Sequence, residues 1–112
     1  MTGIEIYLKA IASLGYGDEP TFKNRAAVCL NQILEELFRL VGEGEFEPIK
    51  TLSEQICLPE GVSRTALVYG LAERLALGTG DGELQQYFAR QYDIARARLT
   101  KASSVTDVLP RA

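Results

Sequence analysis

The chain has 112 residues, a net charge of -3, 46% hydrophobic residues, two cysteines and no histidine. This length fits one small domain with a modest core. The chain has neither an apolar run long enough to span a membrane nor a charged leader before a short apolar stretch. It also has no histidine for acid-base work, no nucleophile motif and no phosphate-binding glycine-lysine sequence. We therefore expect a non-enzymatic protein that is made in the cytoplasm, stays off the membrane and binds no metal or cofactor.

The charges are unevenly distributed along the chain. Residues 1–60 hold ten acidic and five basic residues, whereas residues 61–112 hold seven basic and five acidic ones. Such an imbalance either sets the orientation of copies that assemble head to tail, or reflects two solvated faces. The adjacent Glu35 and Glu36 are interpreted as solvated positions. Cys29 and Cys57 are isolated, so they are either two buried thiols or, as the second interpretation, a disulfide or a reactive thiol.

The N-terminal part predicts two helices. Thr2 and Glu5 have capping-box spacing, and Gly15 closes the first helix, whose apolar stripe is Ile4, Tyr7, Leu8, Ile11 and Leu14. Pro20 suits the first turn of a second helix, which we expect to reach Val41. This helix is apolar over much of its circumference, so it either lies at the centre of the core or faces a neighbouring subunit. Its apolar positions are Phe22, Ala26, Cys29, Leu30, Ile33, Leu34, Leu37, Phe38, Leu40 and Val41.

A loop and a short apolar segment follow. Residues 42–48 are acidic and punctuated by glycine, which predicts a mobile surface loop. Residues 49–58 form either an extended or hairpin-like element or a single helical turn, because periodicity does not decide between them. Pro59 ends this segment, and Ser63 is predicted to cap the next helix.

Residues 65–99 predict a helical hairpin around which the rest of the chain is organised. The first arm has a broad apolar face made of Leu67, Val68, Leu71, Ala72, Leu75 and Ala76, so we expect it to be buried. Gly70 costs this helix about 1 kcal/mol relative to alanine, and we expect another backbone to pass close to it. Residues 78–82 (GTGDG) predict a tight turn with a left-handed residue and a capping Asp81. The turn only superficially resembles a phosphate or calcium loop, because it lacks the lysine of the first and the spaced acids of the second.

The second arm carries an apolar stripe, with Tyr87 and Ile94 on its shoulders; the stripe is Leu84, Phe88, Tyr92, Ala95 and Leu99. It is also basic, through Arg90, Arg96, Arg98 and Lys101. This basic side indicates nucleic-acid binding, a solvated face or a strip of ion pairs between subunits, and the isoelectric point of about 5.0 argues against tight duplex binding. Residues 102–112 lose helical periodicity and predict a flexible tail, which is either a frayed end or a segment that docks on a partner.

The sequence thus predicts an all-α fold. We expect a small bundle of about four helices within a domain of residues 1–101, with a short extended or hairpin element near residues 49–58. A flexible C-terminal tail of residues 102–112 follows it.

The order of features in residues 52–92 resembles the head-tail connector, or neck adaptor, family of tailed bacteriophages and prophages. The family pattern is an apolar segment ending in Leu-Pro, an Ala-Leu-x-Tyr-Gly-Leu-Ala helix, a small loop with an aspartate, and an aromatic-x-x-x-Tyr helix. The matching residues here are Ile56, Cys57, Leu58 and Pro59; Ala66, Leu67, Tyr69, Gly70, Leu71 and Ala72; Asp81; and Phe88 with Tyr92. The resemblance covers the C-terminal half closely and the N-terminal helices only in general character.

This resemblance implies a structural virion protein that forms a ring beneath the portal and joins the DNA-filled head to the tail. The implied partners are the portal protein, tail-side neck proteins and further copies of the chain, dodecameric in the assembled particle, with at most weak contact to DNA. The implied location is the host bacterial cytoplasm during assembly and then the virion neck. In the family, the region matching residues 43–48 and 51–55 contacts neighbours. The predicted subunit or portal interface is Phe46, Ile49, Leu52, Arg96, Arg98, Lys101, Val105, Val108 and Leu109.

The alternative is a small helical regulatory or protein-interaction module, one form of which associates with DNA through a helix-turn-helix-like hairpin. The apolar character of residues 66–77 argues against it, because a recognition helix must present polar and basic side chains to the groove.

Overall fold

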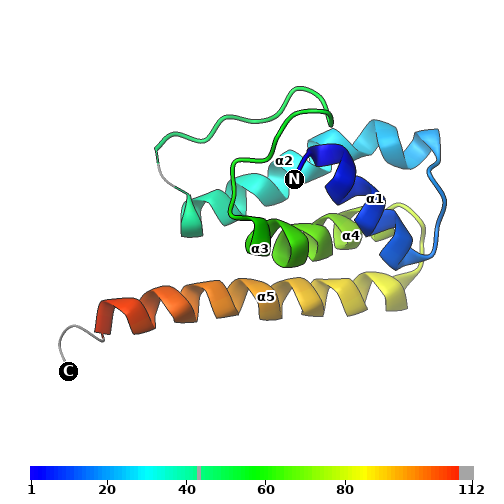
Figure 1. Cartoon of the computed structure of the whole chain (residues 1–112). Coiled ribbons are helices and arrows are strands. Elements are labelled where there is room, and N and C mark those ends of the chain that lie inside the picture. The colour runs from blue at the N-terminus through cyan, green and yellow to red at the C-terminus, as the bar shows by residue number, and fades with distance from the viewer. Residues whose placement is uncertain (43, 109–112) are drawn as a thin grey trace.

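The computed structural model describes the backbone of residues 1–42 and 44–108, and the side chains of these residues up to Leu99. The helices in chain order are α1 (Gly3–Leu14), α2 (Pro20–Val41), α3 (Glu60–Val62), the π-helical turn η1 (Ser63–Leu67), α4 (Val68–Leu77) and α5 (Gly82–Val108). Because α3, η1 and α4 follow one another without a break, they form one helical rod, and the bundle has four helical units (Figure 1). The described residues contain no strand beyond one isolated bridge. The predicted all-α bundle is therefore confirmed.

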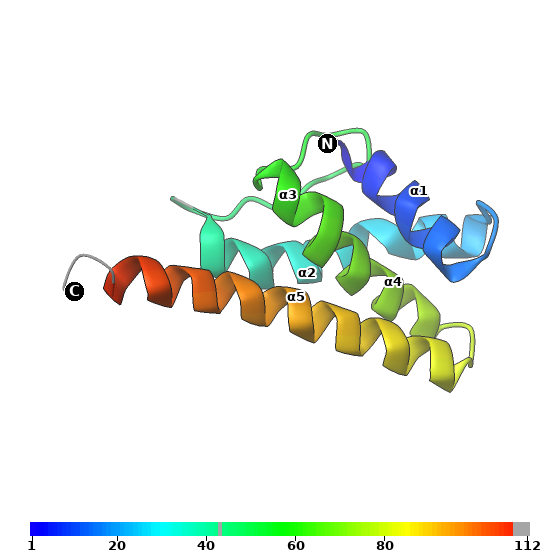
Figure 2. The same cartoon turned by 60° about the horizontal axis from the view of Figure 1, so that its bottom comes forward.

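The rod of α3, η1 and α4 lies at the centre of the molecule. It packs against α1, α2 and α5, and α5 runs alongside it in the opposite direction (Figures 1 and 2). Its buried positions are Val62, Ser63, Ala66, Leu67, Val68, Gly70, Leu71, Ala72, Leu75 and Ala76. The prediction that the first arm of the hairpin is buried is confirmed.

Local capping residues define both ends of α1, as predicted. Thr2 Oγ1 accepts from the Glu5 backbone N–H (3.3 Å), and Glu5 Oε1 accepts from the Thr2 N–H (3.1 Å). Gly15 ends the helix with φ of +80°, a left-handed conformation that glycine adopts without steric cost. The apolar stripe was predicted with a small error in phase, because Leu8 is exposed whereas Ile6 and Ala10 are buried. The buried side is the one that packs against α4.

The second helix has the predicted bounds. Pro20 occupies its first turn and Gly42 its C-terminal cap. Its core-facing positions are Phe22, Ala26, Leu30, Ile33, Leu34 and Leu37, while Val28 is 63% exposed and Leu40 is also exposed. The helix therefore has one buried face, and its remaining apolar residues lie at the edge of the core or in solvent.

The segment of residues 49–58 is irregular, with a turn at residues 51–54, and it pairs with the N-terminus. The N–H groups of Gly3 and Ile4 donate to the carbonyls of Glu54 (3.0 Å) and Leu52 (2.6 Å), and the Ile56 N–H donates to the Met1 carbonyl (2.9 Å). A Cβ at Gly3 would lie 2.9 Å from the Leu52 carbonyl oxygen, so this close pairing requires glycine. Neither of the open alternatives is present as a regular element, because residues 49–58 form no strand and no helix and are joined to the start of the chain by a single bridge between Thr2 and Gln55.

The predicted cap at Ser63 is wrong. The rod begins at Glu60, directly after Pro59, whose backbone is extended. Proline alone sets this helix start, because its ring fixes φ and it needs no N–H partner. Ser63 consequently lies inside the rod, 1% exposed, and its N–H donates to the Pro59 carbonyl (3.0 Å).

The close approach predicted at Gly70 is present, but side chains make it. A Cβ there would lie 2.6 Å from Ile33 Cγ2 and 3.0 Å from the Tyr92 ring, so α2 and α5 both reach the surface of α4 at this point. No backbone needs to pass there, because the side chains of two helices fill the space that a larger residue would occupy.

The turn between α4 and α5 matches its prediction. Gly80 has φ of +80°, and Asp81 Oδ1 accepts from the Leu84 N–H (3.0 Å) as the cap of α5. Since the aspartate is engaged as a helix cap, its role in GTGDG is structural.

The last helix buries Phe88 and Tyr92 and leaves Tyr87 and Ile94 exposed, as the stripe predicted. Its backbone remains helical to Val108, beyond the predicted helix end at Lys101. The physical reason is that no glycine or proline occurs between Gly82 and Val108, so nothing in the backbone chemistry stops the helix there. The end of α5 extends past α2 and α3 (Figures 1 and 2). The predicted flexibility of the tail is not tested, and residues 109–112 lie outside the described part of the chain.

Candidate interaction surface

The 44–58 segment is fixed to α2 by one asparagine. Asn31 Nδ2 donates to the Ile49 carbonyl (3.0 Å), and the Ile49 N–H donates to Asn31 Oδ1 (2.9 Å). Glu54 Oε2 accepts from the N–H groups of Lys50 (2.6 Å) and Thr51 (2.7 Å). These backbone hydrogen bonds lower the pKa of Glu54 below its ordinary value, and the one from Thr51 has the largest effect. The segment therefore has a defined path across the surface.

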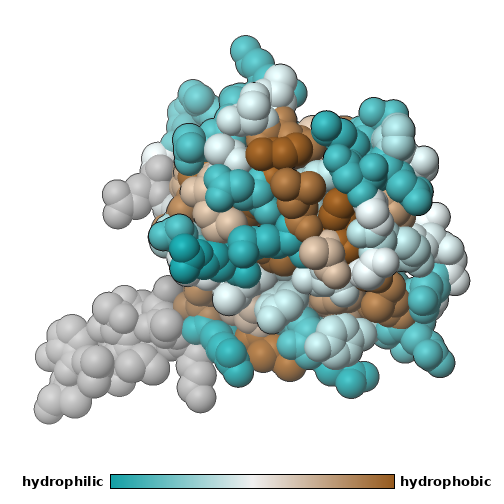
Figure 3. Space-filling view, turned by 45° about the vertical axis from the view of Figure 1, so that its right-hand side comes forward, coloured by the Kyte–Doolittle hydropathy of each residue, from teal (hydrophilic) through white to brown (hydrophobic). Residues whose placement is uncertain are grey.

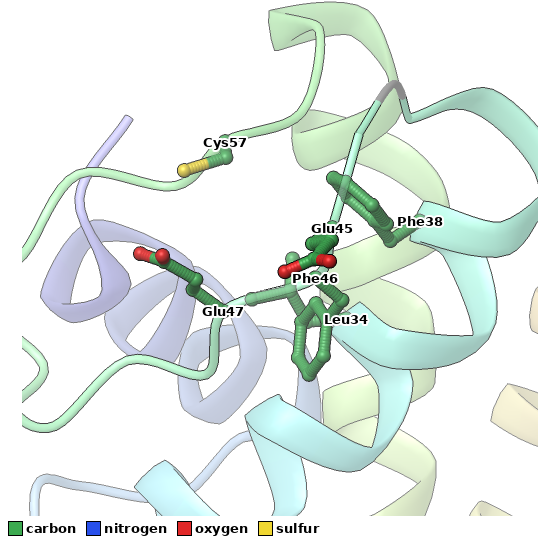
Figure 4. A pocket seen from close by; sticks show the side chains of 6 residues that line it. All are labelled: Leu34, Phe38, Glu45, Phe46, Glu47 and Cys57. Atoms are coloured by element: carbon green, nitrogen blue, oxygen red, sulfur yellow. The ribbon is translucent and has the colours of Figure 1, made fainter.

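A pocket of about 350 Å³ opens between this segment and the C-terminal half of α2. We call it the Phe46 pocket; its lining residues are Leu34, Phe38, Glu45, Phe46, Glu47 and Cys57. The rings of Phe38 and Phe46 lie with their centroids 5.7 Å apart. Figure 4 shows Leu34 and Phe38 coming from α2, with the carboxylates of Glu45 and Glu47 and the thiol of Cys57 around the pocket. The site thus combines an apolar floor with an acidic rim.

The two thiols differ in their surroundings. Both are free; Cys57 is exposed and Cys29 is partly buried. Burial raises the pKa of the Cys29 thiol above its ordinary value. The disulfide alternative is therefore wrong. The buried-thiol interpretation is also wrong for Cys57, which lies at an exposed bend of the chain before α3.

A cluster of ion pairs joins α2, α4 and α5 on one side of the bundle. Glu36 lies 3.4 Å from the Arg74 guanidinium and 3.1 Å from that of Arg96, and Arg96 also reaches Asp93 (3.4 Å). The Arg96 guanidinium lies 5.3 Å from the centroid of the Tyr92 ring, close enough for a cation-π contact. Burial, followed by the negative charge of Glu36, raises the pKa of Tyr92 to about 12. The interpretation of Glu36 as a solvated residue is wrong, since it is half-buried and pairs with two helices.

The outer face of α5 carries a shallow apolar groove flanked by a cation. Its lining comes from the rod and α5 and consists of Thr65, Tyr69, Gln91, Ile94, Ala95, Arg98 and Leu99. Among the described residues, neither Arg90 nor Arg98 has an ion-pair partner. These cations are available to a binding partner.

The predicted interface residues lie in different surroundings in the structure. Phe46 and Arg98 lie at the surface features just described, and Leu52 is half-buried beside the N-terminus. The placement of Ile49 at an interface is wrong, because it is 7% exposed and packs in the core. Asn31 holds its backbone there through two hydrogen bonds, and this contact between residues 18 positions apart is not evident from the sequence. Arg96 is engaged within the chain by Glu36 and Asp93. The side chains of Lys101, Val105 and Val108 and the whole of Leu109 lie outside the described residues.

The sequence analysis did not identify Leu34, Phe38, Glu45, Glu47 and Cys57 as members of one site. The signal available in the sequence was the string EFEP, an aromatic residue between two acids before a proline, which is unusual for a plain surface loop. Nothing local indicates that this string folds back over α2, because the Asn31 contact that holds it there spans 18 residues.

The exposed surface elsewhere is mixed. Among the side chains described, seven large hydrophobic ones are exposed, and they are dispersed over several elements: Leu8, Tyr16, Val28, Leu40, Leu77, Tyr87 and Ile94. On the face shown in Figure 3, brown hydrophobic surface is broken up by teal hydrophilic residues. This pattern favours contacts made by small patches and charges rather than by one broad apolar interface.

The described residues contain no group of three or more His, Cys, Asp or Glu side chains arranged to hold a metal ion. Within the same residues, no helix is both long and apolar enough to cross a membrane. The chemistry that these surfaces offer is apolar contact and ion pairing.

Compared with protein-family models, curated protein sequences and solved structures, the chain matches none of them.

Proposed function

We propose that this chain is a head-tail connector of a tailed phage or prophage, a structural protein without enzymatic activity. Copies would form a ring beneath the portal and join the DNA-filled head to the tail. The observation that carries the proposal is the ordered set of sequence features over residues 52–92, which resembles this family. The partners are the portal protein, tail-side neck proteins and further copies, with weak DNA contact at most and no cofactor.

Two features of the fold support this function. The motif residues Ala66, Leu67, Gly70, Leu71 and Ala72 are all buried, so the resemblance concerns the framework of the bundle. The surfaces left for assembly lie at its edges: the acidic Phe46 pocket beside α2, and the end of α5, which projects past α2 and α3 (Figure 1). Complementary surfaces on one chain are suited to repeated association of identical copies.

The alternative regulatory function is less well supported. A helix-turn-helix protein must insert an exposed helix into the major groove. In the hairpin here, α4 is enclosed by α1, α2 and α5, and α5 buries Phe88 and Tyr92 against it. With a net charge of -3, the chain also lacks the basic footprint that phosphate contacts require.

Deleting the gene in the phage or prophage that encodes it tests the proposal. We expect particles with packaged heads that fail to join tails, seen by electron microscopy, and restoration of complete particles by the gene supplied in trans. In addition, the purified chain should co-sediment with the portal protein encoded by the same genome. Complete infectious particles from the deletion strain, or a genome with no portal, capsid or tail genes near this one, would refute the function.

A further inference from the structure

The Phe46 pocket has a floor and a rim that call for an apolar and basic occupant. Its floor is the aromatic pair of Phe38 and Phe46 with Leu34, and its rim carries the carboxylates of Glu45 and Glu47. Neither carboxylate has an ion pair or a side-chain hydrogen bond with any residue that the structure describes. An occupant that buries aliphatic groups on the floor and brings cations to the rim would satisfy both features.

The C-terminal segment of the chain has this chemistry. Residues 98–112 read RLTKASSVTDVLPRA, with three basic residues (Arg98, Lys101 and Arg111), one acidic residue (Asp107) and four larger aliphatic ones (Leu99, Val105, Val108 and Leu109). Arg98, where the segment begins, is exposed and has no ion-pair partner among the described residues. The segment is thus a charge complement to the pocket.

The pocket and the segment meet most readily between two copies. The backbone of α5 is helical to Val108 and carries the chain away from the body, past the ends of α2 and α3 (Figures 1 and 2). Only four residues follow Val108, and they would have to turn back toward α2 and α3 to reach the pocket of their own chain (Figure 1). A second copy can present its pocket to this end without any such reversal.

We infer that the C-terminal end of α5 from one copy docks in the Phe46 pocket of a second copy, with its aliphatic side chains on the floor and its cations against Glu45 and Glu47. At about 350 Å³ the pocket is at the small end of ligand-binding cavities, so it accepts a few side chains from the end of the segment and not a whole helix. The inference rests on the proposed function in that it takes another copy as the partner. It deepens that function by naming both contact surfaces.

The exposed Cys57 provides a reporter inside the pocket. An acceptor variant carries Cys29→Ser and keeps Cys57 as its only thiol; a donor variant carries Cys29→Ser, Cys57→Ser and Leu109→Cys. After the two full-length variants are mixed with oxidised glutathione, we expect a disulfide-linked heterodimer on a non-reducing gel. A donor with its single thiol at the exposed Thr21 of α2, from Thr21→Cys, sets the background of random collision.

Charge reversal distinguishes specific docking from disulfides that form by random collision. Glu45→Lys with Glu47→Lys in the acceptor should lower the yield of heterodimer about tenfold, since two ion pairs at about 0.7 kcal/mol each amount to about 1.4 kcal/mol. Arg111→Glu in the donor should restore part of the yield, because Arg111 lies two residues from the docked Leu109. The matched control reverses two exposed acids elsewhere, Glu19→Lys with Glu83→Lys, and should leave the yield unchanged.

Three results would overturn the inference. The first is a heterodimer yield no higher than that of the Thr21→Cys donor. The second is equal yield with and without the charge reversal at Glu45 and Glu47. The third is a disulfide that forms within single chains when one variant carries both Cys57 and Leu109→Cys, because the occupant would then be the same copy.

The proposed function and the docking inference can be refuted independently of each other. If the full chain binds the portal protein but the cross-link is absent, the connector function stands and the docking inference is wrong. If the cross-link forms with the expected charge dependence but the chain does not co-sediment with the portal protein, docking between copies stands and the connector function is wrong.

Discussion

The helices α2, α4 and α5 pack closely around Gly70, and Gly70→Ala tests whether the bundle depends on this packing. The added methyl group would lie 2.6 Å from Ile33 Cγ2 and 3.0 Å from the Tyr92 ring, whereas non-bonded carbon atoms pack at about 3.5–4.0 Å. Ile33 cannot easily yield, because Cγ2 is attached directly to Cβ and a β-branched side chain has one strongly preferred χ1 in a helix. The helices must therefore separate.

The magnitude follows from two opposing effects. Replacing glycine by alanine inside a helix favours folding by about 1 kcal/mol, and overpacking a core disfavours it by about 1–3 kcal/mol. The contact with Ile33 is too short by roughly an ångström, which places the overpacking near the upper end of that range. We expect Gly70→Ala to lower the free energy of unfolding by about 2 kcal/mol, and the melting temperature by roughly 8 °C for a domain of this size.

Urea unfolding followed by circular dichroism measures this change. The matched control is Gly61→Ala in α3, where an added Cβ meets nothing within 4 Å; its stability should stay the same or rise by up to about 1 kcal/mol. The double variant Gly70→Ala with Ile33→Ala should lose less stability than the sum of the losses of the two single variants, because truncating Ile33 makes room for the methyl group. A Gly70→Ala protein as stable as the Gly61→Ala control would refute the reasoning.

Three further predictions concern the surroundings of the candidate surface. Asn31→Ala removes both hydrogen bonds to Ile49 and should cost about 1–3 kcal/mol, with faster amide hydrogen exchange in the segment before α3; exchange unchanged there would contradict its role as the anchor. A double-mutant cycle of Glu36→Gln and Arg96→Gln should give a coupling free energy of about 0.5–1 kcal/mol that decreases with added salt, and zero coupling at low salt would contradict the ion pair. The pKa of Tyr92 is raised from 10.0 to about 12, so its contribution to stability is complete below pH 10 and is lost as the pH rises toward 12. In a pH titration, the part of the tyrosinate absorbance that disappears in Tyr92→Phe should have its midpoint near 12. A midpoint near 10 would contradict burial of the ring.

The features predicted correctly from the sequence are those that depend on neighbours in the chain. Thr2 with Glu5, Pro20 and Asp81 each act within one helical turn, so their side-chain chemistry alone indicates where a helix begins. The apolar arm of α4 was predicted for a related reason, since a helix that is apolar over most of its surface has to be central in a small domain.

The errors concern side chains whose surroundings come from distant parts of the chain. Ile49 and Cys57 lie on an irregular segment whose path is set by contacts with Asn31 and with residues 1–4. Serine is a common capping residue, but the helix begins at Glu60, directly after Pro59, so Ser63 lies inside it. The candidate pocket could not be predicted because its floor and rim come from parts of the chain that only the fold brings together.

The end of α5 illustrates how core and surface residues act together in the proposed contact. Glu36 on α2 holds Arg96 (3.1 Å) and Arg74 on α4 (3.4 Å), so α5 is tied to two other helices just before Arg98 and the docking segment begin. Glu36 touches neither proposed contact surface, yet it sets the direction in which the end of α5 leaves the body. If this is correct, Glu36→Gln should lower the yield of the cross-link between Cys57 and Leu109→Cys even though it leaves the charges of pocket and segment unchanged. An unaltered yield would mean that the segment finds the pocket without being directed by the helix, and that only the local charges of the two surfaces matter.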